Sequence, residues 1–182
     1  MGRPRQYNKI VAIESIATIE IISKKYGLFY ALIDIEDVDK VKNYTWGVFL
    51  NSSNNKFYIK TDIIKNNKKS TLFIHTLLTN CNILMQVDHI NHNTLDNTKN
   101  NLRIVTIKQN SENLQGCNKN NLSSGIRGIS WHKTKKIWSV KIGHNGIQIH
   151  GGSFTDLKEA EQKAIELRLK YFTHSNMDLV MI

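Results

Sequence analysis

The sequence predicts an α+β fold in which short strands outnumber helices. Residues 10–75 and 123–172 both contain runs of strand-forming residues separated by turn-forming ones. Only the second stretch ends in a long amphipathic pattern. A segment dense in polar side chains lies between them. A polar linker follows this central segment, and a tail follows the last segment. We therefore divide the chain into residues 1–71, 72–114, 115–122, 123–172 and 173–182.

Residues 1–71 are expected to form a β-rich region with a basic arm at its start. A short helix is expected over residues 37–44, with Val38 and Val41 facing inward. Trp46 is expected in the core. A run of Asn and Ser separates the last two of the four expected strands, which are IATIEII, FYALIDI, TWGVFL and KFYIKTDII.

The charge of the chain favours a polyanionic partner. Its 25 Lys and Arg residues exceed its 15 Asp and Glu residues, which gives a net charge of +10. Nucleic acid therefore precedes an anionic membrane surface as the expected partner. From Arg103 to Lys141 there are eight basic residues and a single acid, Glu112. The middle and C-terminal parts are thus expected to face phosphates.

The cysteines and the hydropathy exclude several classes of protein. Cys81 and Cys117 are far apart and form no Cys-x-x-Cys pair, so we expect neither a structural zinc nor a disulfide framework. No apolar run reaches the ~18 residues of a membrane span, and the N-terminus lacks the apolar core of a signal peptide. We expect a cytoplasmic protein with no membrane partner and no small-molecule cofactor.

The polar central segment contains the run VDHINHNTLDNTKNNLRIVTIKQNSEN, which starts at Val87. Asp88 and His89 are adjacent in it, and Asn101 immediately precedes the strand-like LRIVT. Further along, Thr106 and the Gln three residues later form a capping-box pattern, so a helix is expected to begin at about residue 107. That helix would carry Asn110.

This set of residues resembles the HNH nuclease motif of phage and intron-encoded endonucleases. In that family an Asp-His pair ends a first strand, an Asn precedes a second strand, and a further Asn or His lies on the next helix. The resemblance implies a ββα-metal nuclease core over residues 72–114, in which Asn101 or its backbone orients the ring of His89.

The chemistry of phosphodiester hydrolysis explains why these residue types are wanted. The reaction needs an activated water, a cation beside the phosphate and stabilisation of the departing 3′ oxygen. His89 can take the proton of the water at neutral pH. Asp88 and Asn110 offer the hard oxygen ligands that suit Mg²⁺ or another divalent cation such as Mn²⁺.

Two positions differ from the family pattern. The family often has Asp-Gly where this chain has Asn91 and His92, so His92 is a candidate alternative base or phosphate contact. In LFIHTLL, His75 matches a family His that commonly precedes Arg-Leu, but Thr76 replaces the Arg here. His75 is therefore a candidate phosphate contact or a structural residue beneath the site.

Residues 123–172 predict a three-stranded antiparallel meander packed on one helix. In IWSVKI the alternate residues starting at Trp138 are apolar, and Asn145 with Gly146 predicts a hairpin turn. Asp156 and Glu159 mark the start of the helix. Its apolar positions recur at spacings of three and four, at Leu157, Ala160, Ala164, Leu167 and Tyr171.

This segment resembles the DNA-binding domain of plant ethylene-response factors, which recurs fused to phage HNH nucleases. SGIRGISWHK, KIWSVKI and the Gly-x-Phe of GGSF are the shared marks, although Gly151-Gly152 stands where the family often has Leu-Gly. The resemblance implies that the exposed face of the sheet enters the major groove. Trp138 is expected in the core, and the turn lysines, Lys135 among them, could also be merely solvated. The expected DNA contacts are Arg127, Trp131, Lys133, Lys136 and Lys141.

The chain start adds a weaker signal, because Gly2-Arg3-Pro4-Arg5 resembles the core of an AT-hook. Arg3 and Arg5 are thus either minor-groove contacts or part of a plain basic tail.

Together, these features predict a metal-dependent endonuclease of the homing type that acts on double-stranded DNA. It is expected to be a monomer in a bacterial or phage-infected cell. The alternatives are a non-catalytic DNA-binding regulator and an HNH restriction endonuclease.

Overall fold

A computed structural model describes residues 6–114, 117, 121 and 123–175. Strands predominate and the helices are few, so the α+β class is confirmed. The chain divides into two compact units, residues 1–106 and 107–182, which we describe separately. Arg3, Arg5 and most of the expected linker lie outside the described residues. The expected segment boundaries stay predictions.

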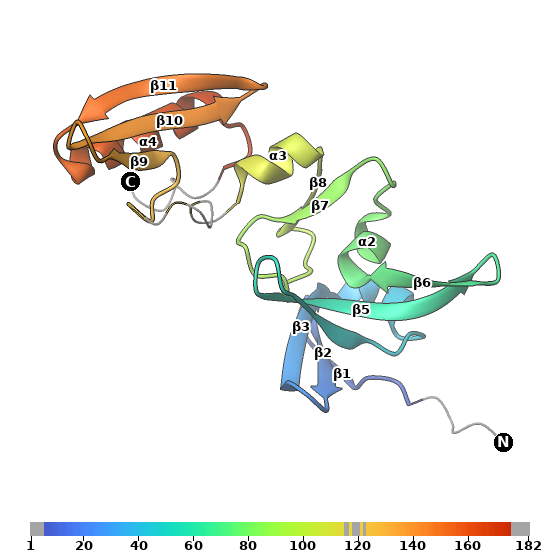
Figure 1. The fold of residues 1–182 in the computed structure, drawn as a ribbon. Coiled ribbons are helices and arrows are strands. Elements are labelled where there is room, and N and C mark those ends of the chain that lie inside the picture. The colour runs from blue at the N-terminus through green and yellow to red at the C-terminus, as the bar shows by residue number, and fades with distance from the viewer. Residues whose placement is uncertain (1–5, 115–116, 118–120, 122, 176–182) are drawn as a thin grey trace. The chain divides into compact units, whose positions relative to one another are not determined.

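The first unit begins with two antiparallel sheets of three strands each, in sequential order (Figure 1). The first sheet contains β1 (Ile10–Ile13), β2 (Ile16–Ser23) and β3 (Gly27–Asp34). The second contains β4 (Gly47–Asn51), β5 (Lys56–Lys65) and β6 (Lys68–Phe73). Four of these strands were expected, whereas β1 and β6 were not.

A helical connection joins the two sheets, formed by a 3-10 helix, η1 (Ile35–Asp37), and α1 (Val38–Val41). Val41 is fully buried and Val38 packs against the same core, as the sequence predicted. Trp46 is also buried, and its indole N–H donates to the carbonyl oxygen of Val41 at 3.1 Å. The alternating buried residues of β2 and β3 complete this core, with Ala17, Ile19, Ile21, Ala31 and Ile33.

The first unit ends with a short helix and a hairpin-like pair of strands. Helix α2 (Ile74–Thr79) packs against β7 (Gln86–His89) and β8 (Leu102–Val105), which pair in antiparallel fashion (Figure 1). Asn80 ends α2 in the left-handed conformation. The sequence predicted both strands but not α2, because a stretch of six residues is too short to show a helical period.

The second unit starts with α3 (Ile107–Glu112), which begins where the capping pattern predicted. An antiparallel sheet follows, with β10 (Ile137–His144) between β9 (Ile129–His132) and β11 (Ile147–Phe154). Helix α4 (Leu157–Tyr171) then packs against the sheet (Figure 1). Its five expected apolar positions belong to the core that it forms with the strands. The three-stranded meander and its helix are therefore confirmed.

Two local predictions in this unit are confirmed in atomic detail. Asn145 and Gly146 have φ values of +53° and +75°, the positive pair that a tight hairpin turn requires. The carboxylate of Asp156 caps α4, because its Oδ1 accepts hydrogen bonds from the backbone N–H groups of Lys158 and Glu159 at 2.7 and 3.0 Å.

Gly151 lies at a β-bulge where β11 passes close to α4. The register between β10 and β11 shifts by one residue after Val140, so Gly151 has no partner opposite it. A Cβ atom at this position would lie 2.7 Å from the Cδ1 of Leu167 and 2.7 Å from the Cγ1 of Val140. The absent side chain thus allows the helix to approach the sheet.

Gly151→Ala is expected to lower the free energy of unfolding of the second unit by about 1 to 3 kcal/mol, because the core must shift to admit one methyl group. Urea unfolding measures the loss. Gly143→Ala is the matched control, since a Cβ at that exposed position of β10 meets nothing within 4 Å. Equal losses in the two variants would contradict the packing account.

Candidate active site

His89 is the last residue of β7 and lies almost fully inside the first unit. Its side chain is 5% exposed, and its Nε2 lies 3.3 Å from the Oδ1 of Asn97. Burial lowers the pKa of His89 below its ordinary value, while the hydrogen bond with Asn97 and the charge of Asp88 oppose that shift. The ring is therefore neutral at pH 7 and can accept a proton.

Asn101 shapes the loop that connects β7 to β8. Its Oδ1 accepts from the backbone N–H of Asn91 at 2.8 Å, and its Nδ2 donates to the carbonyl of Asp96 at 2.7 Å. Its own carbonyl accepts from the N–H of Ile90 at 2.8 Å. The resemblance gave Asn101 the task of orienting His89; in the structure the side chain next to the ring is that of Asn97. Asn101 thus supports the loop that carries Asn97.

Asn97, which is 1% exposed, is a site residue that the sequence did not predict. Its Nδ2 donates to the carbonyl of Leu95 at 3.1 Å, which fixes the amide with its oxygen toward His89. An Asn-rich stretch offered no signal to single it out, because its importance depends on how the loop folds. Asn97 ends the sequence Leu-Asp-Asn in the loop between β7 and β8.

The N-terminal sheets hold this loop from outside the motif. The backbone of β3 pairs with it, as Leu32 N–H donates to the carbonyl of Leu95 at 2.9 Å and its own carbonyl accepts from Asn97 N–H at 2.8 Å. The hydroxyl of Thr94 donates to the carbonyl of Phe57 in β5 at 2.5 Å. The N-terminal region is therefore part of the support of His89.

Asp88 forms a buried ion pair across the two-stranded sheet. Asp88 and Arg103 are direct cross-strand partners. The Nε and Nη2 atoms of Arg103 lie 2.8 and 2.7 Å from the Oδ2 of Asp88, which is 8% exposed. A metal ion at Asp88 would have to share this carboxylate with the guanidinium or displace it.

His75 comes from α2 and lies against His89 in a group of aromatic rings. The two imidazole centroids are 5.3 Å apart in an edge-on arrangement, and the His75 ring stacks on Phe73 at 5.3 Å. Burial, with a smaller effect of His89, lowers the pKa of His75 to about 3. Its Nδ1 is buried and has no hydrogen-bond partner among the described residues. A structural position beneath the site fits these contacts.

Residues 84–112 match the family model for HNH endonucleases. This HNH segment contains β7, the connecting loop, β8 and α3. A protein of Acanthamoeba polyphaga mimivirus, named an uncharacterized HNH endonuclease, is 31% identical over 137 residues, which cover 74% of this chain and 66% of that protein. Protein 3.8 of Escherichia phage T7 is 36% identical over 73 residues, 40% of this chain and 58% of that protein.

The chain thus spans less than two thirds of the length of these two relatives. No solved structure matches it. The finer expectations of a ββα-metal core, a homing role and an ethylene-response-factor-like C-terminal domain stay predictions.

His92 lies at the turn of the HNH loop, with a φ of +64°. The Nζ of Lys56 donates to its backbone carbonyl at 3.1 Å. Burial, and then the charge of Lys56, lowers the pKa of the His92 side chain. Its Nε2 is buried without a hydrogen-bond partner among the described residues. His92 thus lies near the charged groups of the site and remains a candidate phosphate contact.

Asn110 is half-buried on α3, which belongs to the second unit. Its convergence with Asp88 on one cation stays a prediction. In the part of the chain that the structure describes, no cluster of three or more His, Cys, Asp or Glu side chains is arranged to hold a metal ion. A Mg²⁺ site does not require one, since that ion commonly takes one or two protein oxygens and several waters.

The expected lysine contacts are exposed in the second unit. Lys133 and Lys136 lie in the turn between β9 and β10. Lys141 is opposite His150 in the register, on the face of the sheet away from Val140 and Ile142. These positions agree with a basic outer surface, and contact with DNA stays a prediction for them.

Trp131 and Arg127 are placed differently from what the resemblance implies. Trp131 pairs with Trp138, with ring centroids 4.7 Å apart, and therefore lies on the α4 side of the sheet rather than on its outer face. The guanidinium of Arg127 donates to carbonyls at the end of α3, at 2.8 to 3.0 Å, and lies over the ring of Phe172. Within this unit Arg127 therefore caps the carboxyl end of α3. Contact with DNA stays a prediction for Arg127 and Trp131.

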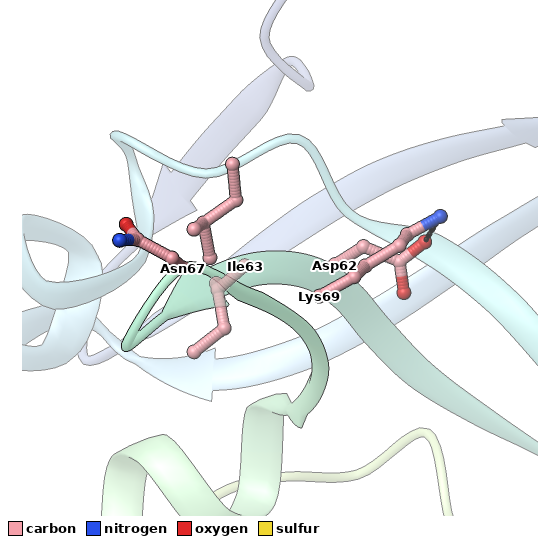
Figure 2. Close-up of a pocket in the computed structure, with 5 residues that line it drawn as sticks. Asp62, Ile63, Asn67 and Lys69 are labelled. Atoms are coloured by element: carbon pink, nitrogen blue, oxygen red, sulfur yellow. Dashed lines mark ion pairs between the residues drawn. The ribbon is translucent and has the colours of Figure 1, made fainter.

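A surface hollow of about 260 Å³ lies at the hairpin of β5 and β6 (Figure 2). Asp62 in it is paired with Lys69 at 3.0 Å, as the dashed line marks, and with Lys60 at 3.5 Å. None of its lining residues belongs to the His89 site, and its charges compensate one another.

Among the described residues, no helix is long and apolar enough to cross a membrane.

Proposed function

We propose that this protein is an endonuclease that hydrolyses phosphodiester bonds in double-stranded DNA with the help of a divalent cation. The observation that carries the proposal is a buried, neutral imidazole, His89, next to the carboxylate of Asp88 in a segment that matches HNH endonucleases. The net charge of +10 supports DNA as the substrate.

His89 acts as the general base in this proposal. The Oδ1 of Asn97 is a hydrogen-bond acceptor, so the Nε2 of His89 carries the ring hydrogen and Nδ1 keeps the lone pair. Nδ1 then takes a proton from the attacking water. Asn101 contributes indirectly, because it fixes the loop that holds Asn97 in place.

Asp88 and Asn110 are the proposed ligands of Mg²⁺ or Mn²⁺. Both offer hard oxygen atoms, and Asp88 lies beside the general base in sequence. The cation, when bound, would offset the negative charge of the phosphate and of the departing 3′ oxygen. The two bonds from Arg103 to the Oδ2 of Asp88 imply that cation binding competes with this ion pair.

The C-terminal sheet is the proposed DNA-holding surface, through Lys133, Lys136 and Lys141. A homing role and a monomeric state belong to the same proposal. The Asp88–Arg103 ion pair also favours one alternative, a non-catalytic DNA-binding regulator, because a carboxylate neutralised by arginine is a weaker metal ligand. An HNH restriction endonuclease would use the same site.

Incubation with supercoiled plasmid tests the proposal. Relaxed and linear DNA are expected with Mg²⁺, none with EDTA, and full activity again when excess Mg²⁺ is restored. Asp88→Asn is expected to raise the Mg²⁺ concentration for half-maximal rate by about tenfold or more, as changes at metal sites commonly do. Asp62→Asn, on β5 outside the HNH segment, should leave it unchanged. DNA binding without scission in Mg²⁺ or Mn²⁺ would establish the regulator instead.

A further inference from the structure

Lys56 brings a positive charge from the N-terminal sheet to the edge of the HNH loop. It is the first residue of β5, directly after the Asn-rich turn, and its side chain is half-buried. Its Nζ donates to the carbonyl of His92 at 3.1 Å. The backbone carbonyl of the next residue, Phe57, accepts a hydrogen bond from the hydroxyl of Thr94. Two adjacent contacts therefore fix the start of β5 against this loop.

The ammonium lies within the electrostatic reach of the groups proposed to do the chemistry. The charge of Lys56 contributes to lowering the pKa of both His89 and His92, and Asp88 acts on Lys56 in return. Burial is the main influence on Lys56 and lowers its pKa. A partly desolvated cation interacts with an anion more strongly than one in bulk water does.

Asp88 interacts with two cationic side chains. Its carboxylate pairs with the guanidinium of Arg103 at 2.7 Å, and it also interacts electrostatically with Lys56. The other acid near His89, Asp96, accepts hydrogen bonds from Asn91 and Thr98 within its own loop. A phosphate that enters beside His89 would lie within the electrostatic reach of Lys56.

We propose that the ammonium of Lys56 contacts a non-bridging oxygen of the scissile phosphate and stabilises the charge that grows there during attack. This inference rests on the proposed function and adds a substrate contact from outside the HNH segment. The water oxygen bonds to phosphorus, and His89 takes the proton of the water. The bond from phosphorus to the 3′ oxygen breaks, and that oxygen leaves with the bonding electron pair and takes a proton from solvent. Lys56 forms and breaks no covalent bond in this step.

A purely structural role is the competing account, in which Lys56 only anchors the carbonyl of His92. Lys56→Gln separates the two, since glutamine keeps an N–H donor but has no charge. Lys56→Arg keeps the charge. Lys65→Gln is the matched control, because Lys65 is exposed at the opposite end of the same strand.

The first measurement is the single-turnover rate of plasmid cleavage, together with the Kd for the same DNA in EDTA. Lys56→Gln is expected to lower the rate by about 100-fold, the usual effect of losing one donor to a developing oxyanion. Its Kd and thermal midpoint should stay within about twofold and 2 °C of the wild type, because one phosphate contact adds little to the Kd and glutamine keeps a donor for the carbonyl of His92. Lys56→Arg should recover at least a tenth of the lost rate. A wild-type rate in Lys56→Gln, or a rate loss that follows a lowered thermal midpoint, overturns the proposal.

The second measurement does not depend on cleavage. Inorganic phosphate is titrated into the full-length protein while NMR follows the ring signals of His89 and His92. Both should shift in the wild type and in Lys65→Gln, and the response should weaken at least fivefold in Lys56→Gln. If the wild type cleaves no DNA, the proposed function fails while this anion-binding result still stands. The absence of a phosphate response in the wild type, or an equal response in Lys56→Gln, contradicts the role of Lys56.

Discussion

His89→Ala is expected to lower the rate of Mg²⁺-dependent plasmid nicking by about 100- to 10,000-fold, the range that a general base supplies. The variant loses the only imidazole that is both placed at the end of β7 and held by Asn97. DNA binding in EDTA should remain at the wild-type level, because the proposed binding surface lies on the second unit. Single-turnover nicking and a filter-binding titration measure the two quantities.

His174→Ala provides the control for the loss of a histidine, since it lies outside the HNH segment. A substantial fall in nicking by this control would point to a general effect on the protein. Should His89→Ala nick plasmid at a rate within threefold of the wild type, His89 is not the base. His92, with its lowered pKa and its place near Lys56, would then be the next candidate to replace.

Acidification from pH 7 to pH 4 is expected to destabilise the first unit through His75 by about 3 kcal/mol, at about 1.36 kcal/mol per pKa unit. The pKa of His75 is about 3 in the folded protein and near its ordinary value of 6.5 in the unfolded chain. The unfolded state therefore binds the proton first. This part of the stability is complete above pH 6.5 and is lost as the pH falls from 6.5 toward 3.

His75→Phe tests this effect because phenylalanine keeps a ring next to Phe73 and cannot be protonated. Urea unfolding at several pH values, followed through amide NMR signals of β2 and β3, gives the free energy of the first unit. The other histidines of the unit titrate in both proteins, so the difference between the two curves isolates His75. Parallel curves for wild type and His75→Phe would rule out a buried, neutral His75 as the source of acid sensitivity.

The sequence predicted those parts of the fold that depend on neighbours along the chain. The turn at Asn145 and Gly146, the cap at Asp156 and the apolar spacing of α4 are local patterns, and all three are confirmed. The motif from Asp88 to Asn101 was equally visible, because its residue types lie within one loop and two strands. Six-residue α2 and the edge strands β1 and β6 were too short or too irregular in pattern to detect.

The contacts that complete the site could not be read in the same way. Lys56 and His92 are 36 residues apart, and their contact exists only because β5 packs against the loop. The bond of Asn97 with His89 likewise depends on the loop conformation that Asn101 imposes. The face on which Trp131 lies was likewise not readable, since strand register and not residue type decides it; its contact with DNA stays a prediction.

The hydrogen bonds from β3 and β5 to the loop have a practical consequence for protein engineering. A fragment cut to residues 72–114 would retain every amino acid of the motif and lose the backbone groups of Leu32 and Phe57 on which the loop rests. The smallest portable cassette therefore includes both N-terminal sheets. Grafting the motif alone into another scaffold would transfer the reactive groups without the backbone contacts that hold the loop in its conformation.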